Sequence, residues 1–247
     1  MTTKLEAPAQ EPRNVDGGGT ASLAGVSRAF GAVRALDGLD LEVGAGEIVA
    51  VVGPSGCGKT TLLELVCGLQ APDAGRVRAD PAVLMPQRDN LLPWLRAIDN
   101  AALALRLGGA SRDEARARAR PLFATFGLEG FERARPHELS GGMRQRVAFL
   151  RTLLSGKPVL CLDEPFAALD ALTRREMQDW LAQALSRERR TVLLVTHDVE
   201  EAARLGDRVV VLSPRPGRVV AQIGVPRPRS EADVLAVREQ AVEALRS

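Results

Sequence analysis

The chain has few of the residues that would point to several common classes of protein. It contains no tyrosine, two histidines and three cysteines in 247 residues. Cys57, Cys67 and Cys161 are odd in number, far apart in sequence and set among apolar or glycine-rich residues, which argues against a disulfide framework and against a zinc site. We interpret them as small buried side chains.

Long apolar runs are also missing. The longest is about five residues, whereas a membrane-spanning helix needs about 20. Lys4 and Glu6 are followed by no apolar stretch, so no secretory signal is predicted. We therefore expect the protein to act in the cytoplasm, and any membrane role to come through a partner. The net charge of +2 is too small to imply nucleic acid as a ligand.

What the chain does contain is a glycine-rich stretch between an apolar run and a helix-like segment. It reads Gly53, Pro54, Ser55, Gly56, Cys57, Gly58, Lys59, Thr60, Thr61. The order strand, glycine turn, helix is the context of a phosphate-binding P-loop. Its glycines let backbone N–H groups point toward an anion, and the helix that begins near Lys59 adds the positive end of its dipole.

This stretch predicts a site for a nucleotide and a metal ion. Only three of the 33 basic residues are lysines, so a lysine at position 59 is informative. We expect Lys59 to reach the β- and γ-phosphates and the hydroxyl of Thr60 to bind Mg²⁺, with Thr61 beside it.

Apolar runs later in the chain predict the sheet that carries this loop. Residues 83–85, 159–162 and 191–195 are short and continuously apolar, which is typical of parallel strands buried on both faces. We expect an α/β fold: a P-loop nucleoside triphosphatase core with a mostly parallel sheet, an antiparallel β subdomain, and a helical subdomain inserted at about 88–156. The other expected elements are strands at 21–27 and 33–43 connected through Phe30, a turn at 72–75, helices at 98–107, 112–126 and 142–154, a hairpin at 209–212 and 219–223, and a helix at 231–245.

Two segments are expected to be solvated. Residues 1–20 combine prolines, a run of glycines and scattered charges without apolar periodicity, so we predict a disordered tail. The arginine and alanine run at 112–120 is interpreted as a solvated helix face.

Polar residues stand where the predicted core strands end. Gln87, Asp163, Glu164 and His197 each lie at the carboxyl end of one of the three apolar runs. Ligands of parallel sheets bind beyond those ends, so these residues should converge with the P-loop. We expect Asp163 to bind Mg²⁺ directly or through a neighbour, Glu164 to orient and partly deprotonate the attacking water, and His197 to hold that water or the γ-phosphate.

A second distinctive stretch opens the helix expected at 142–154. It reads Leu139, Ser140, Gly141, Gly142, Met143, Arg144, Gln145. A serine hydroxyl, two glycine amides and a helix N-terminus form a second anion site, at Ser140, Gly141 and Gly142. Because one chain rarely needs two such sites, we expect a two-fold dimer in which this stretch faces the P-loop of the other copy.

Together these motifs resemble the ATP-binding subunit of ABC transporters. The ordered set is the P-loop, a Q-loop at Gln87, the 139–145 signature, the acidic pair at 163–164, a D-loop at 168–170 and a switch histidine at His197. It covers about residues 21 to 225. Within that family, residues 87–94, 168–174 and 213–218 look like the nitrate, sulfonate and taurine importer group.

The resemblance implies further roles. Residues 21–247 would be one ABC ATPase domain, Phe30 would stack on adenine, and Gln87 would serve both catalysis and Mg²⁺ binding. The implied partners are a second copy of the chain, a polytopic membrane permease and, indirectly, a solute-binding protein, with the subunit on the cytoplasmic face of the membrane. The solute would be small and anionic or sulfonate-like. For Phe30, core packing is the alternative; for Trp94, a permease contact and packing under the helices stay open.

Other functions fit fewer of the motifs. A soluble ABC-type ATPase that acts on ribosomes or nucleic acid usually has two fused ATPase halves or a long coiled coil, and this sequence has neither. An ordinary P-loop kinase or GTPase would leave the 139–145 stretch without a role, and no Asn-Lys-x-Asp motif occurs. A nucleotide-binding regulator without turnover is disfavoured by Glu164 and His197.

Overall fold

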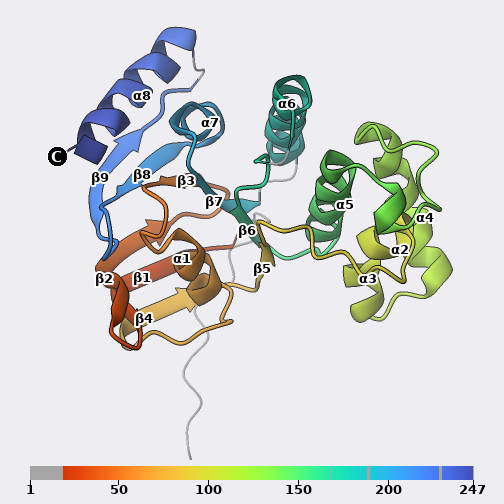
Figure 1. Ribbon diagram of the computed structural model, residues 1–247, viewed down its shortest axis with the longest axis horizontal. Coiled ribbons are helices and arrows are strands. Elements are labelled where there is room, and N and C mark those ends of the chain that lie inside the picture. The colour runs from red at the N-terminus through yellow and green to blue at the C-terminus, as the bar shows by residue number, and fades with distance from the viewer. Residues whose placement is uncertain (1–18, 168, 188–189, 228–229, 247) are drawn as a thin grey trace, which may run out of the picture.

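The computed structural model describes residues 19–167, 169–187, 190–227 and 230–246. The disordered tail predicted at 1–20 lies almost wholly outside these residues, as does Ala168 of the predicted D-loop. Two sheets, the helices that pack on them and an inserted group of helices make up the described chain (Figure 1). The α/β fold with an antiparallel β part and an inserted helical part is therefore as predicted.

The larger sheet brings distant parts of the chain side by side. Its strand order is β5-β6-β7-β3-β8-β9, in which the first five strands are parallel and β9 is antiparallel to β8. Every residue of β3, β6 and β7 is buried, since helices or the second sheet cover both faces. The strands are β3 (Ile48–Val52), β5 (Ala82–Met85), β6 (Val159–Asp163), β7 (Thr191–Thr196), β8 (Arg208–Leu212) and β9 (Val219–Gly224).

The smaller sheet is antiparallel, with the order β2-β1-β4. Its strands are β1 (Ala21–Phe30), β2 (Val33–Val43) and β4 (Ala74–Ala79). Two expectations were wrong here: Phe30 ends β1 instead of lying on a connection, and β4 begins where a turn was predicted. Strand β4 is an edge strand that is mostly exposed, so it has no apolar alternation to reveal it.

Side chains of β3 alternate between two apolar cores. Val49 and Val51 face α1 (Lys59–Val66) and the smaller sheet, whereas Ala50 and Val52 face the core on the other side. That second core includes α6 (Ala171–Arg187), α7 (Val199–Leu205) and α8 (Glu231–Arg246), which lie across the sheet from α1 in Figure 1. The strand that leads into the P-loop is thus fixed on both faces.

The inserted helices lie to one side of both sheets in Figure 1, and α5 (Gly141–Leu153) shares the second apolar core with the larger sheet. The inserted helices are α2 (Ala97–Ala101), α3 (Leu103–Leu107), α4 (Arg112–Thr125) and α5, with a short 3₁₀ helix, η1 (Pro136–Glu138), before α5. A single helix was predicted at 98–107, but it breaks at Ala102. None of the helices in the described part of the chain has the length and apolar character needed to span a bilayer.

Arginines of α4 hold a buried acid of α2. Arg112 and Arg116 contact the Asp99 carboxylate at 3.1 and 2.8 Å, and the Asp99 side chain is only 3% exposed. Burial raises the pKa of Asp99, but the hydrogen bonds and charges of the two arginines outweigh it and lower that pKa to about 2. The interpretation of 112–120 as a solvated face was therefore wrong for Arg116, whose side chain is 24% exposed, but it holds for Arg112, whose side chain is 53% exposed.

The three cysteines are free thiols. Cys57 and Cys161 are buried as expected, while Cys67 at the end of α1 is only partly buried.

Candidate active site

The P-loop connects β3 to α1 in a conformation that needs its glycines for two different reasons. Gly56 and Gly58 have φ values of 76° and 104°, in the left-handed region that side chains with a Cβ avoid. Gly53 is needed for space, because a Cβ there would lie 2.8 Å from the Cys57 sulfur and 3.1 Å from the Leu212 carbonyl oxygen. Both requirements hold the loop close to the sheet.

Lys59, the first residue of α1, lies inside the loop. Its side chain is buried, and its Nζ donates to the carbonyl oxygens of Gly53 at 2.8 Å and Pro54 at 3.0 Å. The ammonium is thus held at the centre of the loop, where a phosphate group would be surrounded by backbone N–H groups and the start of α1.

Thr60 and Asp163 form the adjoining pair. The Thr60 hydroxyl donates to Asp163 Oδ2 at 2.8 Å, and Asp163 is 4% exposed. Burial raises the pKa of Asp163; the Thr60 hydrogen bond opposes this rise and the nearby charge of Glu164 adds to it. Burial makes the ionised form of Asp163 costly, and a neighbouring cation would stabilise that form.

These oxygen groups fit Mg²⁺, which prefers hard oxygen ligands and keeps several sites for water and substrate phosphates. Among the described residues, no three His, Cys, Asp or Glu side chains form a cluster that would hold a metal by themselves. The groups that would hold such an ion are the predicted ones, namely the Thr60 hydroxyl, the Asp163 carboxylate and the amide oxygen of Gln87.

The Glu164 carboxylate contacts two other predicted site residues, Gln87 and His197. Gln87 Nε2 donates to Glu164 Oε2 at 3.1 Å, and His197 Nδ1 lies 3.2 Å from the same oxygen. Glu164 has a φ of 46°, unusual for a residue with a side chain, and its backbone N–H donates to the Val195 carbonyl at 2.8 Å. The neighbouring strand β7 thereby helps to fix the angle at which this carboxylate leaves β6.

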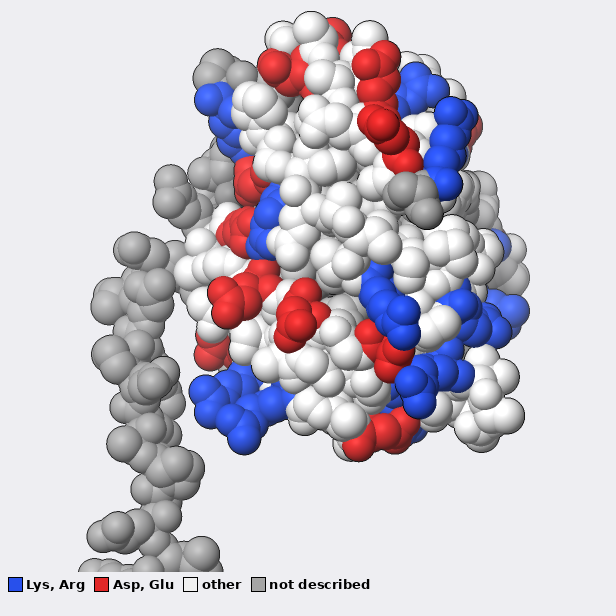
Figure 2. All heavy atoms as spheres, turned by 90° about the vertical axis from the view of Figure 1, so that its left-hand side faces the viewer, with Lys and Arg blue, Asp and Glu red and all other residues white. Residues whose placement is uncertain are grey.

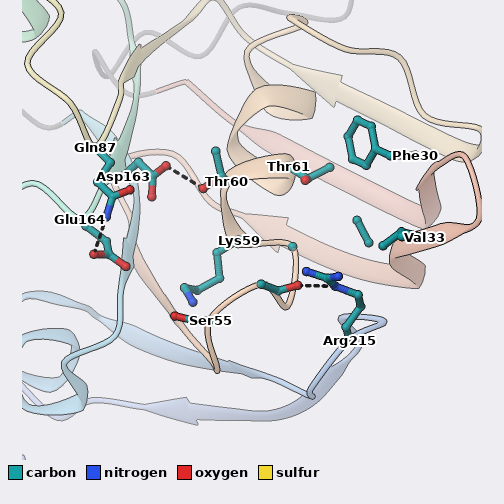
Figure 3. A pocket seen from close by; sticks show the side chains of 13 residues that line it. Phe30, Val33, Ser55, Lys59, Thr60, Thr61, Gln87, Asp163, Glu164 and Arg215 are labelled. Atoms are coloured by element: carbon teal, nitrogen blue, oxygen red, sulfur yellow. Dashed lines mark hydrogen bonds between the residues drawn. The ribbon is translucent and has the colours of Figure 1, made fainter.

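These groups line one cavity of about 340 Å³ (Figure 3). Of the predicted site residues it contains Phe30, Ser55, Gly56, Gly58, Lys59, Thr60, Thr61, Gln87, Asp163 and Glu164. Gly53, Pro54 and Cys57 lie in the loop behind the lining, and His197 reaches the site through Glu164. Val33, Ala35 and Arg215 also line the cavity and were not predicted.

Two aromatic residues can now be placed. The Phe30 ring is 46% exposed at the edge of the cavity, so plain core packing is excluded for it. Trp94 is 66% exposed, which excludes packing under the helices.

The signature stretch lies elsewhere in the chain. Ser140 caps α5 by accepting a hydrogen bond from the Met143 N–H at 3.2 Å, and Gly141 and Gly142 form the first turn. None of the three lines the cavity that holds Lys59, and α5 belongs to the inserted helices at the side of the sheets in Figure 1. Within one chain, the two predicted anion sites are separate.

Strand β3, the P-loop and α1 are followed in the sheet, two strands away, by β6 with the acidic pair Asp163 and Glu164 at its end. This arrangement defines a P-loop nucleoside triphosphatase. The family model described as "ABC transporter" matches residues 36–167. A "Taurine import ATP-binding protein" of Burkholderia pseudomallei (strain 1710b) is 48% identical in an alignment of length 201 that covers 78% of this chain and 77% of the relative. An uncharacterized ABC transporter ATP-binding protein of Methanocaldococcus jannaschii is 44% identical in an alignment of length 214 that covers 82% of this chain and 80% of the relative.

Solved structures agree with this assignment. A dimeric ATP-binding cassette bound to ADP and phosphate in a post-hydrolysis state has a TM-score of 0.76 and 30% identity, and covers 83% of this chain and 99% of its own. The chain belongs to the ABC transporter family, and it is an ATP-binding subunit with ATPase activity. The alternative of an ordinary P-loop kinase or GTPase is therefore wrong, and a soluble ATPase of ribosomes or nucleic acid finds no support in these relatives.

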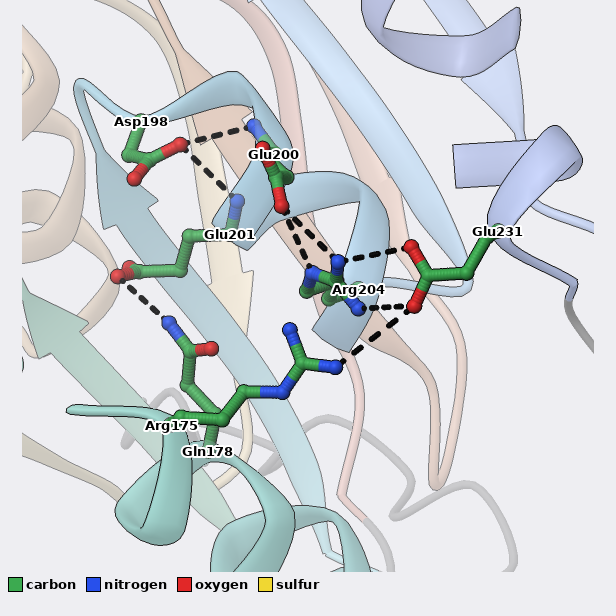
Figure 4. A network of polar contacts seen from close by, with 7 residues as sticks. All are labelled: Arg175, Gln178, Asp198, Glu200, Glu201, Arg204 and Glu231. Atoms are coloured by element: carbon green, nitrogen blue, oxygen red, sulfur yellow. Dashed lines mark hydrogen bonds and ion pairs between the residues drawn. The ribbon is translucent and has the colours of Figure 1, made fainter. Parts of the chain in front are cut away.

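A buried acid lies in α7, shortly after His197 in the sequence. Glu201, in the first turn of α7, is 5% exposed and accepts a hydrogen bond from Gln178 Nε2 of α6 at 3.3 Å (Figure 4). Within the described residues its Oε1 has no hydrogen-bond partner. Burial and the charge of Asp198 raise the pKa of Glu201 to about 7, although Thr196, Gln178 and Arg174 oppose the rise.

We expect Glu201→Gln to stabilise the protein in a pH-dependent way. Because the folded-state pKa is raised from 4.5 to about 7, only the folded chain keeps this proton between those values, so Glu201 costs stability as the pH rises. Urea unfolding should show a gain of up to about 3 kcal/mol at pH 8 and a much smaller one at pH 5. Glu239→Gln, which removes the same charge from an exposed position of α8, is the control. Equal gains from Glu201→Gln at both pH values would contradict the account.

Proposed function

We propose that this chain is the ATP-hydrolysing subunit of a membrane importer and works as a dimer of two copies. The observation that carries the proposal is the division of the site: Lys59, Asp163 and Glu164 line one cavity, while Ser140, Gly141 and Gly142 lie away from it. A two-fold dimer gives each cavity the signature of the other copy. The dimeric cassettes among the similar structures support this arrangement.

In this proposal the residues of the cavity divide the work between binding and hydrolysis. Lys59 and the backbone N–H groups of the P-loop hold the β- and γ-phosphates, and Phe30 stacks on the base. Glu164 orients the water that attacks the γ-phosphorus and accepts its proton as the bond to the β-phosphate oxygen breaks. Mg²⁺, when bound at Thr60 and Asp163, neutralises charge on the phosphates. Gln87 and His197 hold the Glu164 carboxylate in position.

The loop after β5 contacts α5, the helix that begins with the signature stretch. It is therefore suited to transmit the binding of a membrane partner to that helix. Arg144 of α5 pairs with Asp89 at 3.1 Å, and Arg151 of α5 donates to the carbonyl oxygens of Asp89 and Asn90 at 2.7 and 2.9 Å. A movement at exposed Trp94, a few residues further along the loop, would thus be transmitted to α5. We assign Trp94 to the contact with a permease on the cytoplasmic face of the membrane.

The proposed solute is a small anion or sulfonate, selected by a separate solute-binding protein. This rests on the relatives named as taurine import ATP-binding proteins. A nucleic-acid role is not favoured, because basic and acidic side chains are interspersed over the described part of the face shown in Figure 2.

Extraction of the tagged chain from its own cells in mild detergent tests the proposal. We expect a polytopic membrane protein in stoichiometric amount, with Trp94→Ala weakening this association but leaving the ATPase activity of the free subunit unchanged. Leu69→Ala removes a similarly exposed apolar side chain outside this loop and is the control. Recovery of ribosomes or nucleic acid instead would refute the importer assignment.

Binding of taurine, alkanesulfonates and nitrate to the solute-binding protein of the same complex tests the solute class.

A further inference from the structure

Arg215 comes from the far edge of the larger sheet and reaches over the P-loop. It lies in the turn between β8 and β9, and its Nε donates to the Gly56 carbonyl oxygen at 2.8 Å. The guanidinium occupies the place that a side chain would take at Gly56, since a Cβ there would lie 2.6 Å from an Arg215 terminal nitrogen. The glycine thus makes room for the arginine as well as for the turn of the loop.

The turn that carries Arg215 is fixed to the smaller sheet. The Gly217 N–H donates to the Ala35 carbonyl at 2.8 Å, and the Asp37 N–H donates to the Gly217 carbonyl at 3.2 Å. The Arg218 side chain does not line the cavity and pairs with Asp37. These backbone hydrogen bonds fix the turn, which places Arg215 beside the P-loop.

The guanidinium lies between the two ends of the cavity (Figure 3). One end is formed by Phe30 and Val33, which suits a base, and the other by Lys59, Thr60 and Asp163, which suits the terminal phosphates and a cation. Within the described residues the structure gives the guanidinium no acceptor other than Gly56. Its terminal N–H groups are thus available at the place where the ribose and its adjoining phosphate would lie.

We propose that Arg215 is a nucleotide-binding residue that donates to the phosphate next to the ribose. The inference rests on the proposed nucleotide site and adds a contact from a part of the chain outside the P-loop. A guanidinium can bind the Gly56 carbonyl through Nε and a phosphate oxygen through its terminal nitrogens at the same time, which a lysine cannot do. Because the phosphate next to the ribose is present in both ADP and ATP, the contact should serve both nucleotides equally.

Calorimetric titration with Mg·ADP and Mg·ATP tests the inference. We expect Arg215→Ala to weaken both nucleotides by about tenfold, the size of one charge-assisted contact at an exposed site, with the ratio of the two affinities unchanged. Arg215→Lys should recover part of the loss because it keeps the charge, and Arg215→Gln should not. Arg218→Ala removes the same charge from the same turn and should bind like the unmodified protein.

Three results would overturn the inference. Equal nucleotide affinities of Arg215→Ala and the unmodified protein would show that Arg215 makes no such contact with the nucleotide. A loss of affinity for ATP alone would show that Arg215 contacts the terminal phosphate instead. Full recovery of affinity by Arg215→Gln would show that Arg215 only hydrogen-bonds to the Gly56 carbonyl. Failure of the unmodified protein to bind either nucleotide would instead refute the nucleotide site itself, whereas loss of the importer assignment would leave this result intact.

Discussion

Glu164→Gln is expected to lower ATP turnover by about 10² to 10⁴ while leaving ATP binding and ATP-dependent dimerisation intact. The glutamine keeps the size of the side chain and an oxygen for the hydrogen bond from Gln87, but it cannot accept the proton of the attacking water. Single-turnover hydrolysis measures the chemical step, and size-exclusion chromatography with ATP measures the dimer.

The control for this variant is Glu47→Gln. Glu47 lies directly before β3, at the end of that strand opposite to the P-loop, and it pairs with Arg208. Its turnover should equal that of the unmodified protein. Hydrolysis by Glu164→Gln at the unmodified rate would show that the proton acceptor is another group.

Gly141→Glu is expected to abolish turnover without affecting the fold or the binding of ADP to one chain. A Cβ at Gly141 would meet only a terminal nitrogen of Arg144 at 3.8 Å, which is ordinary contact, and Gly141 is exposed, so the backbone accepts a side chain here. In the dimer the added carboxylate would face the terminal phosphate held by the other copy and repel it, because like charges at such distances oppose each other strongly. ATPase activity should fall by at least about 100-fold, as for loss of an electrostatic contact to the reacting group.

Leu107→Glu provides a matched control, since it adds the same charge to the same group of helices at a side chain that is 82% exposed. It should leave the ATPase rate of the free subunit unchanged. If Gly141→Glu also weakens ADP binding to a single chain, its effect is not confined to the contact between copies.

Much of the site could be predicted because each motif is local in sequence. Four neighbouring parallel strands, β5, β6, β7 and β3, end just before Gln87, Glu164, His197 and the P-loop, so these residues come to one edge of the sheet. The continuous apolar runs were enough to place them. The structure then added what spacing could not give, namely that Glu164 accepts from Gln87 and lies beside His197.

What escaped prediction depends on contacts over long separations. Arg215 meets Gly56 only because the β8–β9 turn folds against β2, and a turn sequence alone does not say which way its arginine points. Asp99 is held by arginines of α4 that read as a charged surface in sequence. Strand β4 pairs at an edge with few apolar residues, so only its partner β1 reveals it.

The central claim is that each hydrolysis site is completed by the other copy of the chain. Mixing two inactive variants tests it most directly: Lys59→Ala, which lacks the phosphate-binding lysine, and Gly141→Glu, which lacks a working signature. In a mixed dimer one site has both defects and the other has neither, so the mixture should regain up to about one quarter of the unmodified activity by statistical pairing. Activity that stays at the level of the separate variants, although fluorescence-labelled chains show that mixed dimers form, would contradict the composite site.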